Sequence, residues 1–268
     1  MNLRILYVFT STNDQPFLDI REFGILPTWP NLVKSPSEVL ALICQPPKWS
    51  FLVRKFTDFH EKLRWSRFGK YFMAVSKYLL IPLSYWNPKV LKNGGILTTR
   101  TPESYLFMGF KHLAAYQYAF ENNFDFIVAT NSSSFINVRS IEYFLVNLMQ
   151  NESPFYGGRP LPHTNPRGAS GSFYVLDRNA INIILKNKNR WKHSKLDDIA
   201  LRELANKLNL NFQELNSIDA KSPTEIQSIS KEILESSLHF KIGPYFSGGI
   251  RKDSENFKLL WDKFNLYS

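Results

Sequence analysis

Short apolar runs alternate along the chain with segments in which apolar residues recur every three or four positions. The runs, rich in β-branched and aromatic residues, predict buried strands, and the three-to-four spacing predicts amphipathic helices. The predicted strands are residues 3–10, 96–100, 124–130, 155–156, 171–176, 211–215 and 239–242. The predicted helices are residues 38–44, about 50–80, 102–120, 138–149, 178–186, 197–208, 225–236 and 253–264. Strands that alternate with helices predict an α/β fold, in which helices flank a mixed, mostly parallel central sheet.

Turn and capping residues set several of these boundaries. Asp177 is expected to cap the helix that follows it, and Asp197 or Asp198 is expected to cap the next one. The pair Gly157–Gly158 is expected to end a short strand.

Three polar loops follow predicted strands, at residues 11–15, 131–137 and 159–170. In open α/β sheets, ligands bind in the crevice outside the carboxyl ends of the strands. We therefore expect these three loops to surround one cleft.

Composition narrows the class of protein. With 268 residues, 44% hydrophobic and 21% charged, the chain is typical of a globular protein and long enough for a sizeable core. The single cysteine, Cys44, excludes a disulfide framework, a thiolate zinc cluster and a CxxC redox pair. No apolar run reaches the roughly 18 residues of a membrane-spanning helix, and the N-terminal segment lacks a signal-peptide pattern. We expect one domain over residues 1–268, located in the cytoplasm.

The net charge of +10 is concentrated in residues 46–92, which hold ten basic and two acidic residues together with many aromatic ones. Such a segment suits an anionic membrane surface, a nucleic acid or a phosphorylated substrate, and it also suits the solvated basic face of a helical insert. Residues 71–86 are too short to span a membrane, but have aromatic ends typical of interfacial anchoring. We predict peripheral binding to the inner face of a membrane. No nucleic acid is expected, because RNA-binding, helix-turn-helix and zinc-finger signatures are absent.

The common catalytic motifs are also absent. The chain has no GxGxxG after its first strand and no GxxxxGK[ST], HExxH or GxSxG. Its five histidines have no metal-ligand spacing.

Three short motifs nevertheless occur in an informative order. They are Phe135-Ile136-Asn137 after a strand and polar loop, the small-residue strand 168–176, and Asp197-Asp198-Ile199 at a helix start. Over about residues 96–215 this order resembles the GT-A fold glycosyltransferases of the β-1,3-galactosyltransferase and Fringe type. The resemblance implies a GT-A-like, Rossmann-related domain and an inverting, hexosyltransferase-like enzyme. It also implies a nucleotide-sugar co-substrate and a glycan or lipid-linked glycan acceptor.

The chain departs from that family at its metal site. The family's Asp-x-Asp falls in the loop where this chain has Asn131, Ser132 and Ser133. An amide and hydroxyls are poorer ligands than carboxylates for a hard divalent cation. We therefore expect no metal site and a metal-independent reaction, in which cationic side chains such as arginine stabilise the leaving diphosphate. The alternatives are a catalytically inactive GT-A-like domain that binds a glycan or a partner protein, and a basic nucleic-acid-binding protein.

The resemblance also suggests roles for individual residues. Asp198 is the candidate base that takes the proton from the acceptor hydroxyl, with Asp197 as the alternate. Acidic residues at helix starts are common without any catalysis, so this position also has a purely structural explanation. The candidate donor-binding residues are Thr10, Ser11, Thr12, Arg100, Asn131, Ser132, Ser133, His239 and Arg251. The candidate acceptor-binding residues are Arg159, Arg167, Gly168, Ser170 and Gly171.

Overall fold

The computed structural model describes residues 3–44, 91–99, 108–150, 153–162, 164–193 and 195–267. All but the last two residues of the basic segment 46–92 lie outside these ranges, as does Arg100. The predicted helix at about 50–80 lies outside them as well.

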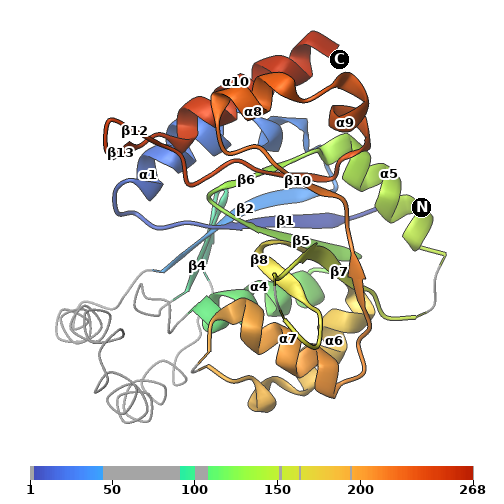
Figure 1. Cartoon of the computed structure of the whole chain (residues 1–268). Coiled ribbons are helices and arrows are strands. Elements are labelled where there is room, and N and C mark those ends of the chain that lie inside the picture. The colour runs from blue at the N-terminus through green and yellow to red at the C-terminus, as the bar shows by residue number, and fades with distance from the viewer. Residues whose placement is uncertain are drawn as a thin grey trace.

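The described residues form an eight-stranded central sheet (Figure 1). Its strand order is β3 (Leu91–Asn93), β4 (Ile96–Thr99), β2 (Glu38–Cys44), β1 (Ile5–Thr10), β5 (Phe126–Asn131), β8 (Ala169–Asp177), β7 (Tyr156–Pro160) and β9 (Phe212–Glu214). Strands β4, β2, β1 and β5 are parallel neighbours, and β7 is parallel to β9. Strands β3 and β8 run antiparallel to their neighbours. The sheet is therefore mixed and mostly parallel, as the sequence predicts.

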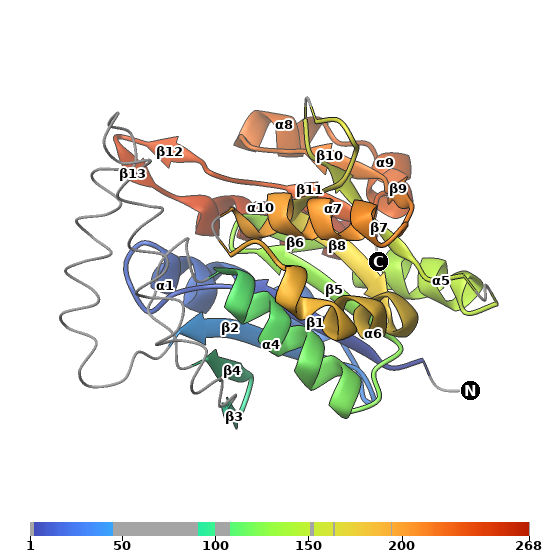
Figure 2. The ribbon, with the colours of Figure 1, turned by 90° about the horizontal axis from the view of Figure 1, so that it is seen from below.

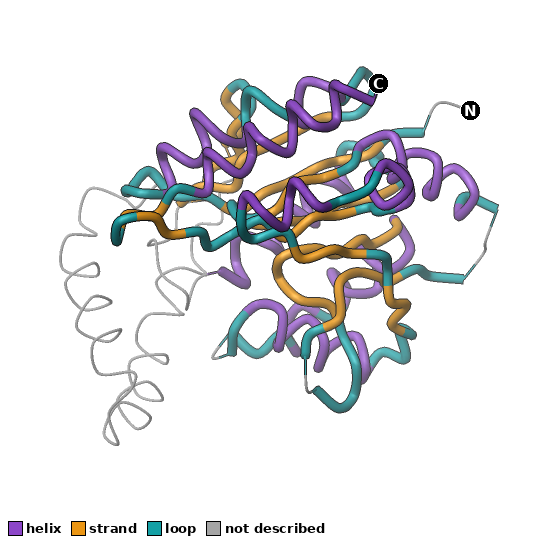
Figure 3. The backbone as a smooth tube through the Cα atoms, turned by 45° about the horizontal axis from the view of Figure 1, so that its top comes forward, coloured by secondary structure: helices purple, strands orange, loops and turns teal. Residues whose placement is uncertain are grey.

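Helices cover both faces of the sheet (Figures 2 and 3). One face carries α4 (Met108–Glu121), α6 (Arg178–Lys186) and α7 (Asp197–Lys207). The other carries α5 (Val138–Leu148), α8 (Pro223–Ser228), α9 (Lys231–Ser236) and α10 (Asp253–Tyr267), together with α1 (Phe17–Asp19), the π-helical turn η1 (Ile20–Ile25) and the 3₁₀ turn η2 (Trp29–Leu32). A 3₁₀ turn, η4 (Lys188–Arg190), follows α6. Among the described residues, no helix is long and apolar enough to cross a bilayer.

The central strand β1 explains how one sheet supports two cores. All six of its residues are buried. Tyr7 and Phe9 pack into the core on the α10 side, whereas Leu6 and Val8 pack into the core on the α4 side. Each such buried apolar side chain contributes about 1.5–3 kcal/mol relative to exposure.

A smaller sheet extends the fold beside β8. Its order is β10 (Ser217–Asp219), β11 (His239–Lys241) and β6 (Ser134–Ile136), and the hairpin β12 (Phe246–Ser247)–β13 (Ile250–Arg251) follows it in the chain. Lys241 in β11 is paired with Ser134 in β6, so the small sheet brings a late lysine beside the loop after β5.

The predicted helix over residues 38–44 is wrong, because this segment is strand β2. Its leucines and alanine favour a helix, but the run is short and apolar after Glu38. It lies between β1 and β4 in parallel register, with residues 40–44 buried. Tertiary pairing on both edges thus outweighs local helix propensity.

Four other boundaries differ from the prediction. Gly157–Gly158 lie inside β7, and the loop predicted at 131–137 contains β6. The helix predicted at 225–236 is two helices, because Ile229 and Ser230 are extended. Leu196, not either aspartate, is the N-cap of α7, and both aspartates lie in its first turn.

The start of α6 is as predicted. The Asp177 carboxylate accepts a hydrogen bond from the Ala180 backbone N–H at 2.8 Å and caps the helix.

Candidate functional site

The strand order creates a crevice at the carboxyl end of β1. From β1 the chain passes to β2 and β4 on one side, and then returns to β5 on the other. A crevice at such a switch of direction is where α/β sheets bind ligands. The segments at the ends of β1 and β5, residues 10–12 and 131–133, both line it.

A cavity of about 550 Å³ occupies this crevice. Besides the two strand ends, it is bounded by β8, by the first turns of α4 and α7, and by residues near the β12–β13 hairpin. It is lined by Thr10, Ser11, Thr12, Asp14, Gln15, Phe17, Met108, Lys111, Asn131, Ser132, Ser133, Ser170, Gly171, Ser172, Leu196, Asp197, Asp198, Pro244 and Arg251.

The first turn of α7 contributes two adjacent carboxylates to the cavity wall. Asp198 Oδ1 accepts from the Ile199 backbone N–H at 2.8 Å, and Oδ2 accepts from the Gly171 N–H at 3.3 Å. A Cβ atom on Gly171 would lie 3.3 Å from Asp197 Oδ2. The glycine therefore lets β8 approach the carboxylates closely.

Asp197 is linked to a chain of buried polar groups. His112 Nε2, from α4, lies 3.0 Å from Asp197 Oδ2, and His112 Nδ1 lies 2.7 Å from the Tyr174 hydroxyl. The Tyr174 hydroxyl is in turn 2.7 Å from that of Tyr116. Burial raises the pKa of the Asp197 carboxyl, but His112 together with the backbone N–H groups of Asp197 and Asp198 brings the pKa below its usual range. Asp197 is therefore held as the carboxylate.

The pKa of Asp198 is shifted in the opposite direction. Burial first, and then the neighbouring Asp197 charge, raise its pKa above the usual range, and the hydrogen bonds from Gly171 and Ile199 oppose this only in part. Two adjacent carboxyl groups whose pKa values are pushed apart are typical of sites that use one of them for proton transfer. Asp198 is the better proton acceptor of the two.

The wall at the ends of β5 and β13 presents mainly hydrogen-bond donors. Asn131 Oδ1 accepts from the Ser133 N–H at 3.0 Å, from Ser134 Oγ at 3.0 Å and from Lys241 Nζ at 3.2 Å. The Arg251 guanidinium donates to Ser133 Oγ at 2.6 Å and pairs with the buried Asp253 carboxylate at 2.6 Å. An anion entering the cavity would meet an amide, hydroxyls and a guanidinium on this side.

Eleven of the residues singled out in the sequence lie together around the cavity. They are Thr10, Ser11, Thr12, Asn131, Ser132, Ser133, Ser170, Gly171, Asp197, Asp198 and Arg251. The described structure does not bring His239, Arg159, Arg167 or Gly168 to its lining, and Arg100 lies outside the described residues.

His239 is the first residue of β11 in the small sheet and is fully buried. Its ring stacks on Phe173 with centroids 4.8 Å apart, and Nδ1 lies 2.7 Å from Ser217 Oγ. Burial, with smaller contributions from Lys241 and Arg159, lowers the pKa of His239 well below its usual value. The imidazole is therefore neutral in the folded protein.

The three remaining acceptor-site candidates also contact residues away from the cavity. Arg159 forms two hydrogen bonds with Asp219, at 2.7 and 3.2 Å. Arg167 is largely exposed and lies 3.7 Å from Glu214. A Cβ atom on Gly168 would lie 2.4 Å from the Arg202 side chain, so Gly168 serves close packing against α7.

Sequence reasoning does not single out Lys111, His112, Lys241 or Asp253, which line the cavity or contact residues of the site. His112 lies four residues from both Met108 and Tyr116, on the apolar stripe of α4, and a polar residue in that stripe is a signal that could have identified it. Lys241 has no such signal, because its neighbours are determined by long-range strand pairing.

The described residues contain no group of three or more His, Cys, Asp or Glu side chains arranged to hold a metal ion. Metal dependence therefore stays a matter for experiment.

No protein-family model and no curated protein sequence matches the chain. Solved structures match at low identity. A glycosyltransferase involved in the glycosylation of the major capsid of PBCV-1 is 10% identical, with a TM-score of 0.43 over 96% of this chain and 100% of that chain. A protein described as a nucleotide-diphospho-sugar transferase from Desulfovibrio desulfuricans is 13% identical, with a TM-score of 0.39 over 79% and 78% of the two chains. Mouse xyloside xylosyltransferase 1 is 12% identical, with a TM-score of 0.42 over 90% and 97%. All three TM-scores are below 0.5, so none of these similarities identifies a function.

Proposed function

We propose that this protein is a glycosyltransferase that moves a sugar from a nucleotide-sugar donor to a hydroxyl of a glycan or lipid-linked glycan, with inversion at the anomeric carbon. The observation that carries the proposal is the cavity at the end of β1, where a carboxylate with a raised pKa lies in the same space as a wall of hydrogen-bond donors. The motif order around Asn137, Gly171 and Asp198 supports the same family of reactions.

The chemistry needs a base at one end of the reacting centre and anion stabilisation at the other. Asp198 accepts the proton of the acceptor hydroxyl as the hydroxyl oxygen attacks the anomeric carbon. The bond from that carbon to the donor phosphate oxygen breaks, and the nucleotide leaves as the diphosphate. Donors around Ser133 and Arg251 stabilise the charge that develops on this leaving group. Attack opposite to the leaving group inverts the anomeric centre.

Asp197 and His112 are positioning residues in this scheme. The His112 imidazole keeps Asp197 ionised, and the negative charge of Asp197 helps to raise the pKa of Asp198. A base whose pKa is closer to the working pH accepts the proton more effectively.

The test has two stages. A melting-temperature screen against UDP-, GDP- and dTDP-sugars, with EDTA or with Mn²⁺, identifies the donor, because a ligand that binds only the folded state raises the melting temperature. Release of the nucleotide product from that donor is then measured for the wild type and for Asp198→Asn. We expect Asp198→Asn to keep donor binding and to lose about 10²–10⁴-fold of the transfer rate, the usual contribution of a general base.

Asp177→Asn is the matched control. Asp177 caps α6 away from the cavity, and asparagine is an equally good cap, so this variant should keep full activity. The proposal is wrong if no sugar nucleotide shifts the melting temperature under either condition, or if Asp198→Asn transfers sugar at the wild-type rate. The first outcome favours an inactive or a nucleic-acid-binding protein.

A further inference from the structure

The hydrogen bonds around Asn131 fix the orientation of its side-chain amide. Two neighbours of its Oδ1 atom, the Ser133 N–H and Lys241 Nζ, can only donate. A third neighbour, Ser134 Oγ, has one proton and shares it between Asn131 Oδ1 and the Ser172 carbonyl oxygen. A backbone N–H and an ammonium group can only donate, so the atom that faces them has to be the amide oxygen. The Nδ2 atom, with two N–H groups, is turned the other way, and no described residue accepts from it. Because Asn131 lines the cavity, this donor end remains accessible to a ligand.

This arrangement disfavours a cation and favours an anion at Asn131. A metal ion at Oδ1 would have to displace a backbone N–H and a positively charged ammonium group. A phosphate oxygen at Nδ2 instead receives a hydrogen bond from an amide whose oxygen is polarised by that same ammonium.

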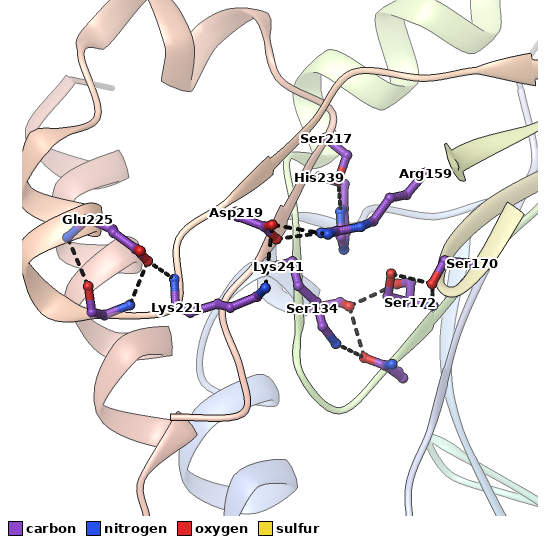
Figure 4. Close-up of polar contacts among 12 residues, drawn as sticks. Ser134, Arg159, Ser170, Ser172, Ser217, Asp219, Lys221, Glu225, His239 and Lys241 are labelled. Carbon is purple, nitrogen blue, oxygen red and sulfur yellow. Dashed lines mark hydrogen bonds and ion pairs between the residues drawn. The ribbon is translucent and has the colours of Figure 1, made fainter. Parts of the chain in front are cut away.

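Lys241 carries positive charge that the described residues do not neutralise. Figure 4 shows Lys241 next to Ser134, with Arg159 and Asp219 above it. The Asp219 carboxylate pairs with Arg159 and Lys221, and no carboxylate forms an ion pair with Lys241 in the described structure. Burial first, and then Arg159, lower the pKa of Lys241 to about 8.

The charged and titratable groups around Lys241 come from four elements. They are Arg159 on β7, Asp219 and Lys221 at the end of β10, His239 on β11, and Arg251 and Asp253 at the β13–α10 junction. Since His239 is neutral, three arginine and lysine side chains besides Lys241 face two carboxylates. A bound anion would neutralise part of this excess positive charge.

We propose that Asn131 Nδ2 binds the diphosphate of the donor directly, with the Lys241 ammonium as the fixed positive charge behind it, in the place where a divalent metal would otherwise act. This inference rests on the proposed function and adds to it how the donor's diphosphate is held. Lys241 is a positioning residue, since it acts through the Asn131 amide.

The decisive variant is Asn131→Asp. A carboxylate of the same size can accept from the Ser133 N–H and from Lys241, so the variant should fold with an unchanged or higher melting temperature. It removes the donating N–H groups and pairs with Lys241, so its affinity for a diphosphate should fall at least tenfold. Affinity is measured by titration calorimetry with UDP, GDP and inorganic pyrophosphate in EDTA.

Lys241 is tested by its pH dependence. In the wild type, affinity for the diphosphate should be full below about pH 8 and should decline between pH 8 and 9, as the lysine loses its proton. Lys241→Met should bind about tenfold more weakly at pH 7 and lose this dependence on pH. Lys241→Arg should retain binding that is constant up to pH 9, because arginine does not deprotonate. Lys231→Met, which removes a lysine from α9 away from the cavity, is the control and should bind as the wild type.

The outcomes separate this inference from the proposed function. Wild-type binding of UDP or GDP that survives EDTA and weakens in both Asn131→Asp and Lys241→Met supports it. Wild-type binding that these two variants leave unchanged, or that requires Mn²⁺, overturns it and leaves the glycosyltransferase assignment standing. Absence of binding to any of the three probes, with or without Mn²⁺, overturns both.

Discussion

Asp197 and Asp198 are neighbours in sequence, but their partners give them different acidities. Asp197 faces a histidine, and Asp198 faces two backbone N–H groups and the charge of Asp197 itself. The His112 imidazole lowers the pKa of both carboxyl groups, although burial outweighs it at Asp198. The acidity of the candidate base is thus set partly by a residue that does not line the cavity.

Replacing His112 by glutamine should therefore move the acid limb of the rate profile. Without the imidazole, the pKa of each carboxyl rises, so both hold their protons to higher pH and kcat/KM declines at a higher pH than in the wild type. We also expect the free energy of unfolding of this variant to be lower than that of the wild type. The lowered pKa of Asp197 contributes stability that is present above its ordinary value of 3.8 and is lost as the pH falls through the folded-state value.

The measurement is kcat/KM between pH 4.5 and 8 together with urea unfolding at the same pH values. Tyr174→Phe is the control, because it removes the far hydroxyl and keeps the contact between His112 and Asp197. A variant His112→Gln that is less stable but has an unmoved acid limb would assign His112 a purely structural role.

Much of the candidate site could be predicted at the scale of residues, because it follows local patterns. Residues 10–12 and 131–133 are polar residues at the ends of apolar strands, and Asp197–Asp198 begin a periodic helix. Lys241 reaches the site through the small sheet, which pairs β11 with a strand more than a hundred residues earlier. No local signal encodes that pairing, so this residue could not be found from sequence.

At the scale of elements, strand β8 is held between β5 and β7 and brings Gly171 next to the carboxylates of α7. Gly157–Gly158 looked like the end of a strand because glycine is common in turns, yet the pair lies inside β7. The same residue type serves a turn at one site and tight strand packing at another, and local sequence does not distinguish them.

Replacing Gly158 by alanine should destabilise the protein by about 1–3 kcal/mol, the usual cost of overpacking. The added Cβ would lie 2.5 Å from the Phe173 carbonyl oxygen and 2.8 Å from the Tyr174 Cα, and both are backbone atoms of β8 that have little room to move. Gly95→Ala is the matched control, since its Cβ would meet no atom closer than 3.9 Å. Urea unfolding of the two variants measures the difference, and equal midpoints would show that β7 and β8 separate without cost.

At the scale of the whole molecule, the candidate site and the excess positive charge lie on different parts of the chain. The strand order concentrates the candidate chemistry at the end of β1, whereas the excess positive charge belongs to residues 46–92. The last two residues of that segment belong to β3, which pairs with β4 at the edge of the sheet. A membrane-bound acceptor would use both features, with the basic segment holding the surface and the cavity holding the donor.

The basic segment should bind anionic vesicles in proportion to its charge. Each lysine or arginine near an anionic surface contributes about 1 kcal/mol, and salt screens this attraction. Replacing Lys62, Arg64, Arg67 and Lys70 together by glutamine should therefore weaken binding to phosphatidylserine-containing vesicles at least tenfold. We expect donor binding to be unchanged, because the proposed donor contacts come from described residues of the cavity. Co-sedimentation at 0.05 and 0.5 M salt, with phosphatidylcholine vesicles as the uncharged comparison, measures both effects. Equal binding to the two kinds of vesicle, or binding indifferent to salt, would mean that the charge of this segment serves another partner.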